Sequence, residues 1–316
     1  MAVTTQAVHP APSPKKTLTA ARRREIKWGL AFLSPWIMGF VLFTAFPLIA
    51  SLVFSVTEFN LLHPDEFKFV GLSNYARLLS DPQVGQSLVI TFKFALIAVP
   101  IAVFVPLGLA LLVNSKHLFG KNFFRAMFFM PTMISAVAAV VVFQAVFNSD
   151  SGWINQFLQS IGIEGPRWFQ DENWVMPALA LMTIWSVGNT MITMLAGLQN
   201  VPTELYEAAK VDGAGTARTF FNITLPMVSP VIFYNLVLAI IGSFQVFIAP
   251  FIIGNGRGDP NGSTMVFNLY LYKTAWSFQD MGYGATLAWL MFVICLALTV
   301  ILFRTQRRWV YYATGE

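Results

Sequence analysis

Hydroxyl and amide side chains follow one face of an apolar stretch in this 316-residue sequence. The residues recur at i, i+3, i+4 and i+7, which places on one side of a helix Ser186, Asn189, Thr190 and Thr193. Neutral donors and acceptors of this kind can bind the hydroxyls of a polyol. They can equally join two helices by hydrogen bonds inside a membrane. The spacing alone leaves both interpretations open: the wall of a translocation cavity, or hydrogen-bonded contact between helices.

A later apolar stretch carries a second set of neutral hydrogen-bonding groups near Gly242. This set consists of Tyr234, Asn235, Ser243 and Gln245. None of these side chains is charged at neutral pH. A path lined by both sets would therefore suit an uncharged, hydroxyl-rich solute better than an ion.

Several kinds of chemistry are missing from the sequence. Gly120-Lys121 is followed by Asn122 and lacks the earlier glycine of a phosphate-binding loop, so ATP binding of the P-loop type is not expected. A zinc-protease motif, a cysteine cluster and a nucleophile elbow are also absent from the sequence, and Cys295 is the single cysteine. The apolar stretches hold almost no ionisable groups, although ion-driven carriers usually bury such groups as proton relays. We expect no cofactor on this chain and an energy source outside it.

The composition indicates a membrane protein. Of all residues 56% are hydrophobic and 11% are charged, whereas about a quarter are charged in a typical soluble domain. About 20 apolar residues cross a bilayer. Six stretches reach that length, at 28–56, 87–113, 124–147, 174–198, 226–253 and 283–303. The predicted fold class is an all-α integral membrane protein with six transmembrane helices.

The distribution of charge predicts the orientation of these helices. Most of the 20 Lys and Arg residues lie in the first tail, in the connections after the second and fourth stretches, and after the sixth. Most of the 15 Asp and Glu residues lie in the other connections. The positive-inside rule then places both termini in the cytoplasm. Lys93, near the outer end of the second stretch, either extends to the headgroups or serves as a buried functional charge.

The same reading divides the chain into three parts. Residues 1–27 form a disordered, basic cytoplasmic tail, residues 28–303 form the six-helix domain, and residues 304–316 form a cytoplasmic tail. The first stretch is about twice the length of the apolar part of a signal peptide, and no cleavage site of small residues closes it. We therefore expect an uncleaved first transmembrane helix.

The cytoplasmic connection 202–226 is more specific than a simple turn. It predicts two short helices separated by a break at Asp212-Gly213, since glycine ends a helix in a left-handed conformation without a steric penalty. The second helix is expected to run from Thr216 to about Asn222. Leu225-Pro226 then leads into the fifth apolar stretch.

This connection resembles the "EAA" loop of ABC importer permeases. That motif has Glu-Ala-Ala, a glycine six residues after the glutamate, and Ile-x-Leu-Pro further on. The matching positions here are Glu207, Ala208, Ala209, Asp212, Gly213, Ile223, Leu225 and Pro226. Weaker phrases elsewhere, such as Leu33-Ser34-Pro35-Trp36, look like the carbohydrate branch of the family, of the first-subunit type similar to the maltose and glycerol-3-phosphate permeases.

The resemblance implies the fold of a type I ABC importer permease, in which this loop couples to a separate ATPase and the chain itself has no catalytic site. The implied coupling residues are those of the motif together with Arg218. The implied partners are a second permease, usually a different chain, two ATP-hydrolysing subunits that carry ATP and Mg²⁺, and an extracytoplasmic solute-binding protein. Alternating access would move a sugar across a bacterial or archaeal cell membrane.

The same family places substrate contacts in the helices that flank the coupling loop. On this chain the implied substrate path comprises Trp185, Ser186, Asn189, Thr190, Tyr234, Asn235, Ser243 and Gln245. Two alternatives remain open at this stage: an ABC permease for a non-sugar solute, and a carrier that works without an ATPase.

Overall fold

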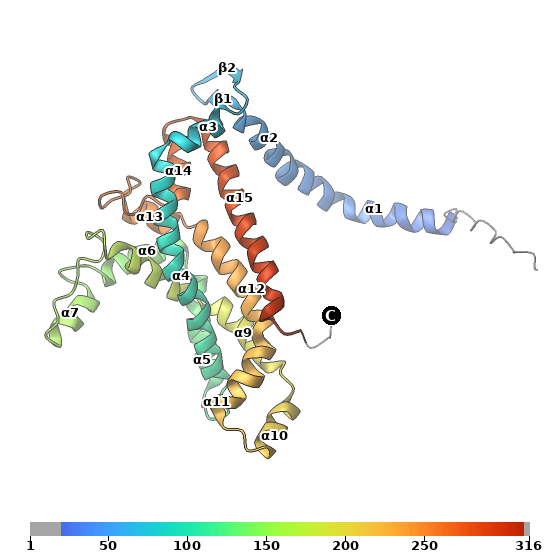
Figure 1. Cartoon of the computed structure of the whole chain (residues 1–316), viewed down its shortest axis with the longest axis vertical. Helices are drawn as coiled ribbons and strands as arrows, with labels where there is room; N and C mark the ends of the chain where they lie inside the picture. Colours follow the sequence, from blue (N-terminus) through green and yellow to red (C-terminus); the bar gives the residue numbers. More distant parts are fainter. Residues whose placement is uncertain (1–19, 313–316) are drawn as a thin grey trace, which may run out of the picture. The chain divides into compact units, whose positions relative to one another are not determined.

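The computed structural model describes residues 20–312, and these are mostly helical (Figure 1). Most of the tail predicted at 1–27, and residues 313–316 of the tail predicted at 304–316, lie outside this range. Residues 20–27 are helical rather than disordered, because Ala, Arg and Glu favour a helix that continues into the apolar stretch. The chain divides into two units, Met1–Val53 and Phe54–Glu316, which are described separately.

The first unit contains one long apolar helix. Helix α1 (Ala20–Phe40) passes through a π-helical turn at Val41–Ala45 into α2 (Phe46–Ser55). The wider turn lies just before Pro47, whose ring would collide with a carbonyl group of a regular α-helix. The segment Arg24–Ser55 is long and apolar enough to cross a membrane, as predicted for 28–56.

The second unit begins with a β-hairpin. Strand β1 (Thr57–Asn60) pairs antiparallel with β2 (His63–Phe69), and Thr57 lies opposite Phe69. Next come α3 (Ser73–Ser80) and the long helix α4 (Pro82–Asn114). The hairpin marks one end of this unit, which we call the hairpin end (Figure 1).

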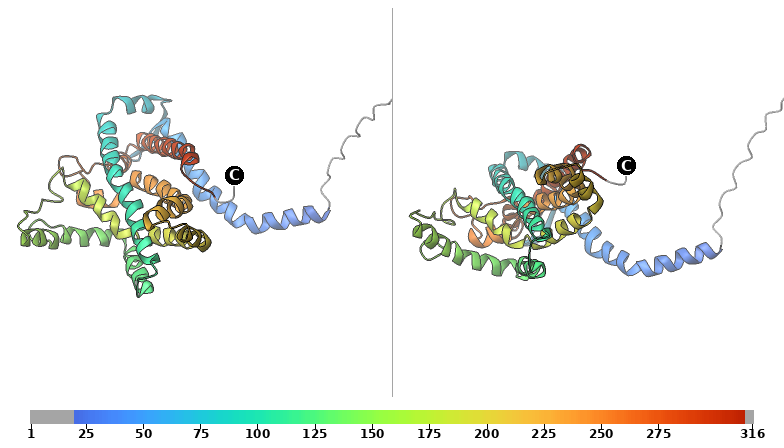
Figure 2. Two further views of the ribbon diagram at one scale, coloured as in Figure 1. Left: turned by 60° about the horizontal axis from the view of Figure 1, so that its bottom comes forward. Right: turned by 90° about the horizontal axis from the view of Figure 1, so that it is seen from below.

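Helix α4 is the axis of the second unit. It packs against α8 (Val175–Met182), α9 (Gly188–Gln199), α12 (Leu225–Phe244) and α14 (Phe267–Tyr272), and Figure 2 shows it from two further sides. Its buried side chains belong to successive apolar clusters along its length. Phe94 and Ala98 pack with α8, whereas Val103 and Leu107 pack with α9 and α12. Because α9 and α12 both pack against α4, their polar faces are held at fixed positions relative to it.

The third and fourth apolar stretches are bent. Helix α5 (Lys121–Phe129), with a following 3₁₀ turn to Met133, meets α6 (Ala136–Val146) at 103°. The segment 175–186 meets α9 at 56°. In the described part of the chain, four helices could span a membrane by length and composition, or six if each bent pair counts as one span. The all-helical prediction with six spans is confirmed on that count, but the bends were not predicted.

Each bend lies at a recognisable local feature. After Pro131 the backbone becomes extended, and Ser135 caps α6 by accepting a hydrogen bond from the Ala138 N–H. In the fourth stretch the bend falls at Gly188, where a Cβ would overlap the Phe128 carbonyl oxygen and the Phe129 backbone. The close approach of α5 to α9 therefore requires glycine at this position.

The remaining elements complete the two ends of the second unit. Helix α7 (Trp153–Ser160) follows α6, and α13 (Ile248–Ile253) precedes the loop that leads to α14. Helix α15 (Met281–Thr305) runs back along the unit from the hairpin end. Helices α10 (Thr203–Val211) and α11 (Thr216–Thr219) lie at the opposite end, which we call the α10 end (Figure 1).

A polar network fixes the hairpin end. Asp81 accepts hydrogen bonds from the hydroxyls of Tyr270 and Tyr283. Arg77 forms a 2.7 Å ion pair with Asp280 and lies over the Tyr283 ring, 3.8 Å from its centroid. Burial alone would raise the pKa of the Asp81 carboxyl, but the tyrosine hydrogen bonds and the charge of Arg77 outweigh it and lower that pKa. Burial and the neighbouring carboxylate raise the pKa of Tyr270 to about 12, so its hydroxyl stays a donor.

Candidate functional site

The loop at the α10 end has the break that the sequence predicts. Helix α10 ends at Val211, and Gly213 takes a left-handed conformation with φ of +69°. The Ala214 N–H donates to the Ala209 carbonyl at 2.9 Å, which closes the turn that glycine commonly makes at the end of a helix. The chain thus reverses direction through a defined turn.

The surface of this loop is accessible. Glu207, Ala208 and Asp212 are exposed, whereas Ala209 is buried against the rest of the unit. Val211 is 87% exposed at the tip of α10. A large apolar side chain that projects from a helix tip among charged residues suits a contact with another protein.

A groove of about 950 Å³ lies beside α10, and we call it the α10 groove. Tyr206, Glu207 and Lys210 line it from α10, and Thr216 and Phe220 line it from the following helix. The Tyr206 hydroxyl lies 3.1 Å from the Thr224 hydroxyl, which ties α10 to that helix. Glu207 of the motif therefore lies on a recessed, partly charged surface.

The second half of the motif differs from the sequence prediction. The predicted helix did not end near Asn222: α11 continues through a π-helical turn at Phe220–Thr224 into α12. Pro226 lies in the first turn of α12, where its missing N–H costs little because the π-helical turn precedes it. Arg218 is exposed, and Ile223, Leu225 and Pro226 are half-buried. The second half of the motif thus lies in one continuous helical run from Thr216 to Phe244.

Two adjoining cavities lie beside α4, and we call them the mid-helix cavities. The smaller one lies between α4, α9 and α12, and the larger one lies between α4, α6, α8 and the start of α13. They share the residues Phe94, Thr183, Ser186 and Val246 and have volumes of about 220 and 370 Å³. Thr190 and Ser243 line the smaller one, and Trp185 lines the larger one. The structure therefore brings together four of the eight residues predicted for the substrate path: Trp185, Ser186, Thr190 and Ser243.

The polar groups of these cavities are neutral. The hydroxyls of Thr183, Ser186 and Ser243 donate to carbonyl oxygens of their own helices, so their oxygen lone pairs remain able to accept. The indole N–H of Trp185 is buried and has no hydrogen-bond partner among the described residues. Hydroxyl acceptors and aromatic surface are groups that a sugar can use.

The other four predicted residues do not line the mid-helix cavities. Asn189 and Gln245 are exposed, and Tyr234 is 55% exposed on α12. Asn235 is buried, and its amide donates to the Val231 carbonyl of the same helix at 2.8 Å. These residues were predicted from their polarity and their position in the sequence, and neither property specifies which side of a helix faces α4.

Sequence reasoning missed residues that complete the cavities. Phe94, Ala98 and Ala102 line them from α4 at intervals of four, and Gly242 lines them from α12. These residues are apolar, so only the i, i+4 spacing on α4 could have indicated them. Among residues 20–312, no group of three or more His, Cys, Asp and Glu side chains could hold a metal ion.

A family comparison covers most of this arrangement. Residues 83–311 match the family "Binding-protein-dependent transport system inner membrane component". That range includes the α10 loop, the α10 groove and both mid-helix cavities.

Curated relatives match along nearly the whole length. The probable ABC transporter permease protein YesP of Bacillus subtilis is 37% identical over 93% of this chain and 95% of its own length. The arabinooligosaccharides transport system permease protein AraP of the same organism is 33% identical over 95% of both chains. The sulfoquinovosyl glycerol transport system permease protein SmoG of Agrobacterium fabrum is 37% identical over 76% of this chain and 77% of its own.

A solved structure shares the fold. A chain of the bacterial alginate ABC transporter, crystallised with an alginate pentasaccharide-bound periplasmic protein, superimposes with a TM-score of 0.76. It covers 92% of this chain and 97% of that chain at 20% identity. The fold is therefore shared with a chain of a known ABC transporter.

Proposed function

We propose that this chain, which belongs to the family of binding-protein-dependent transport system inner membrane components, is the membrane subunit of an ATP-driven importer of a sugar or sugar derivative. The observation that supports a sugar as the solute is the neutral, hydroxyl-bearing lining of the mid-helix cavities. Relatives named for arabinooligosaccharides, sulfoquinovosyl glycerol and lactose support the same class of solute.

The partners follow from the family. Membership makes an extracytoplasmic solute-binding protein a partner of this chain. We propose in addition a second, different permease and two ATP-hydrolysing subunits, which would carry the ATP and Mg²⁺. This chain would carry no cofactor and no catalytic site of its own.

The charge pattern supports an orientation in a bacterial or archaeal cell membrane. With both termini in the cytoplasm, the α10 end faces inward and the hairpin end faces outward. The α10 loop would then meet the ATPases, and the hairpin end would meet the binding protein.

The geometry suggests how the ATPase could move the cavity. Glu207, Val211 and Arg218 would dock the α10 end on the ATPase, with the turn at Gly213 holding the two helices together. The helical run from Thr216 to Phe244 is about 40 Å long at ~1.5 Å per residue, and Ser243 of the smaller cavity lies at its far end. A displacement of the loop would thus reach the cavity through one helix, which is the lever that alternating access requires.

Reconstitution of the full importer in vesicles tests this function. ATP-dependent uptake of a saccharide, stimulated by the binding protein, is the expected result. Uptake into vesicles that contain this chain alone, driven by an ion gradient, would contradict the proposed function and indicate a carrier that works without an ATPase. A thermal-shift screen of the binding protein tests the solute. Stabilisation by phosphate or a polyamine, but by no sugar, would be consistent with an ABC importer but would exclude a sugar as its solute.

A further inference from the structure

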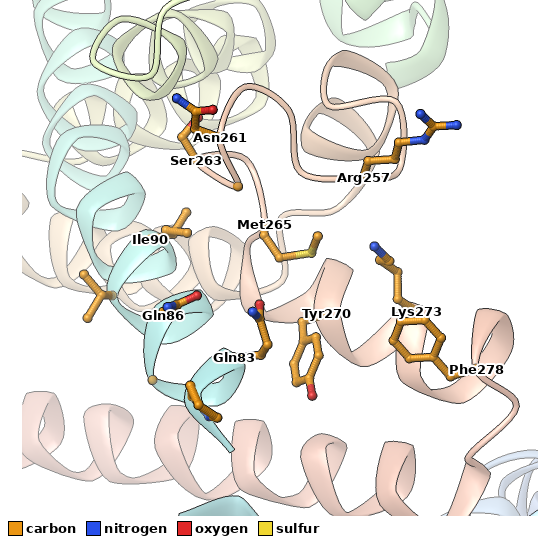
Figure 3. Close-up of a pocket in the computed structure, with 14 residues that line it drawn as sticks. Gln83, Gln86, Ile90, Arg257, Asn261, Ser263, Met265, Tyr270, Lys273 and Phe278 are labelled. Atoms are coloured by element: carbon orange, nitrogen blue, oxygen red, sulfur yellow. The ribbon is translucent and has the colours of Figure 1, made fainter. Parts of the chain in front are cut away.

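The hairpin end holds a larger cavity than the mid-helix pair, of about 1120 Å³, which we call the hairpin-end cavity (Figure 3). It lies between the start of α4, the loop after α13, and α14 with the turn that follows it. Gln83, Gln86 and Ile90 line one side, and Arg257 and Lys273 lie on the other. The volume is sufficient for several sugar rings, because ligand pockets commonly measure about 300–1,000 Å³.

The charge of this cavity distinguishes it from the mid-helix cavities. Its lining includes two cations, Arg257 and Lys273, and no carboxylate. Among the described residues, neither cation forms an ion pair. Lys273 is half-buried, and its ammonium lies 5.8 Å from the centroid of the Phe278 ring, which helps to hold it at the cavity.

Arg257 stands on an ordered loop. Its backbone N–H donates to the Gly254 carbonyl at 2.8 Å, and the Thr264 hydroxyl donates to the Asp259 carbonyl at 2.8 Å across the same loop. The cation therefore projects from a fixed backbone, although its side chain is exposed. A fixed backbone lowers the entropic cost of binding an anion.

The carboxylate that contacts the lining residue Tyr270 is already satisfied. The Asp81 carboxylate accepts hydrogen bonds from Tyr270, from Tyr283 and from the Gln83 N–H. Tyr270 separates this carboxylate from the rest of the cavity, since it lines the cavity and points its hydroxyl at Asp81. The amide groups of Gln83 and Gln86 have no side-chain partner in the described structure and are available to a ligand.

The hairpin-end cavity leads toward the mid-helix cavities. Ile90 lines the former and Phe94 lines the latter, one helical turn apart on the same face of α4. Ala98 and Ala102 continue that face. A solute held at the hairpin end would thus lie directly before the neutral path.

We infer that the hairpin-end cavity binds a saccharide that carries a carboxylate or a sulfonate. Arg257 and Lys273 bind the anionic group, the amides of Gln83 and Gln86 bind ring hydroxyls, and Ile90 and Met265 contact the apolar face of a sugar ring. This inference rests on the saccharide function proposed above, and it adds the charge of the saccharide.

Direct binding to the assembled importer in lipid nanodiscs, without the binding protein, tests the inference. The probes are the β-1,4-linked trimer of glucuronate and the neutral trimer of glucose with the same linkage. We expect the acidic trimer to bind at least about tenfold more tightly, because hydrogen bonds to an ionised group are stronger than those between neutral groups. The double variant Arg257→Gln/Lys273→Gln should bind both trimers alike.

Lys68→Gln is the matched control, because it removes an exposed positive charge from β2 outside the cavity and should leave the preference intact. Equal affinities in the unchanged importer, a preference that survives in the double variant, or no binding of either trimer would overturn the inference. So would a double variant that loses affinity only for the binding protein, since an acidic protein segment would then be the occupant.

The proposed function can fail separately. ATP-driven uptake of a neutral saccharide without a preference at the hairpin-end cavity would overturn only the anionic site. A preference for the acidic trimer in an importer without ATP-driven uptake would overturn only the transport function.

Discussion

The α10 loop and the mid-helix cavities are built in opposite ways. The loop is one contiguous piece of sequence whose turn closes through backbone hydrogen bonds near Gly213, and its functional surface is exposed. The cavities are assembled from α4, α6, α8, α9 and α12, and residues as distant as Phe94 and Ser243 share one lining. A local element can be recognised from residue order alone, whereas an assembled one depends on how helices rotate and bend against one another.

The largest expected effect comes from the loop. Glu207→Arg reverses a charge in the α10 groove and should nearly abolish ATP-driven uptake while leaving membrane insertion intact. Glu204→Arg is the matched control on the same helix, since Glu204 lies outside the motif and outside the groove lining. The measurement is uptake together with co-purification of the ATPase. Normal uptake by Glu207→Arg would mean that the loop does not couple.

A second large effect should come from the close approach of α5 to α9 at Gly188. Gly188→Ala places a methyl group against the α5 backbone and should destabilise the fold by ~1–3 kcal/mol. Gly108→Ala on α4 is its control, since a Cβ there meets nothing within 4 Å. Thermal unfolding of the purified complex compares the two variants. Equal melting temperatures would show that the close approach at Gly188 is not required.

The mid-helix cavities predict a smaller, selective effect. Thr190→Leu fills part of the smaller cavity and removes a hydroxyl, so uptake should fall several-fold with assembly preserved. Asn189→Leu, one residue earlier and outside the cavity lining, should change uptake less. An equal or larger loss in Asn189→Leu would place the path on the other face of α9.

The smallest effect is expected at the hairpin-end network. Asp81→Asn removes the charge that accepts both tyrosine hydroxyls and should lower the melting temperature slightly at neutral pH. Because folding lowers the pKa of Asp81 below its ordinary value of 3.8, this stabilisation is present above that pH and is lost as the pH falls through the lower value. The difference between the two proteins should therefore shrink in acid. A difference that is constant with pH would exclude the charge as its cause.

The same contrast explains what could be predicted from the sequence. The helical class, the four long spans and the turn at Gly213 follow from apolar length and local backbone preference. The bends at Pro131 and Gly188 could not be predicted, because proline and glycine also occur inside straight membrane helices. The continuous helix through Leu225-Pro226 was missed because proline normally signals a helix start, whereas here a π-helical turn precedes it.

The candidate site shows the same limit. The family resemblance together with residue type placed eight side chains in the predicted substrate path, and four of them line the mid-helix cavities. Tyr234 and Asn235 lie on α12 with Ser243, but burial of one face against α4 decides which of them reaches a cavity. The hairpin-end network joins Asp81 to Tyr270 across 189 positions, and no local pattern indicates that pairing.

Cross-linking from the tip of α10 tests the central claim most directly. The full chain with Val211→Cys and Cys295→Ser would be assembled with its partners and treated with a short thiol-reactive cross-linker. We predict one dominant product that joins this chain to the ATPase subunit, because Val211 projects from the exposed end of the loop. Labelling of that cysteine from the extracellular side of intact cells, with no product to the ATPase, would contradict the coupling role of the loop.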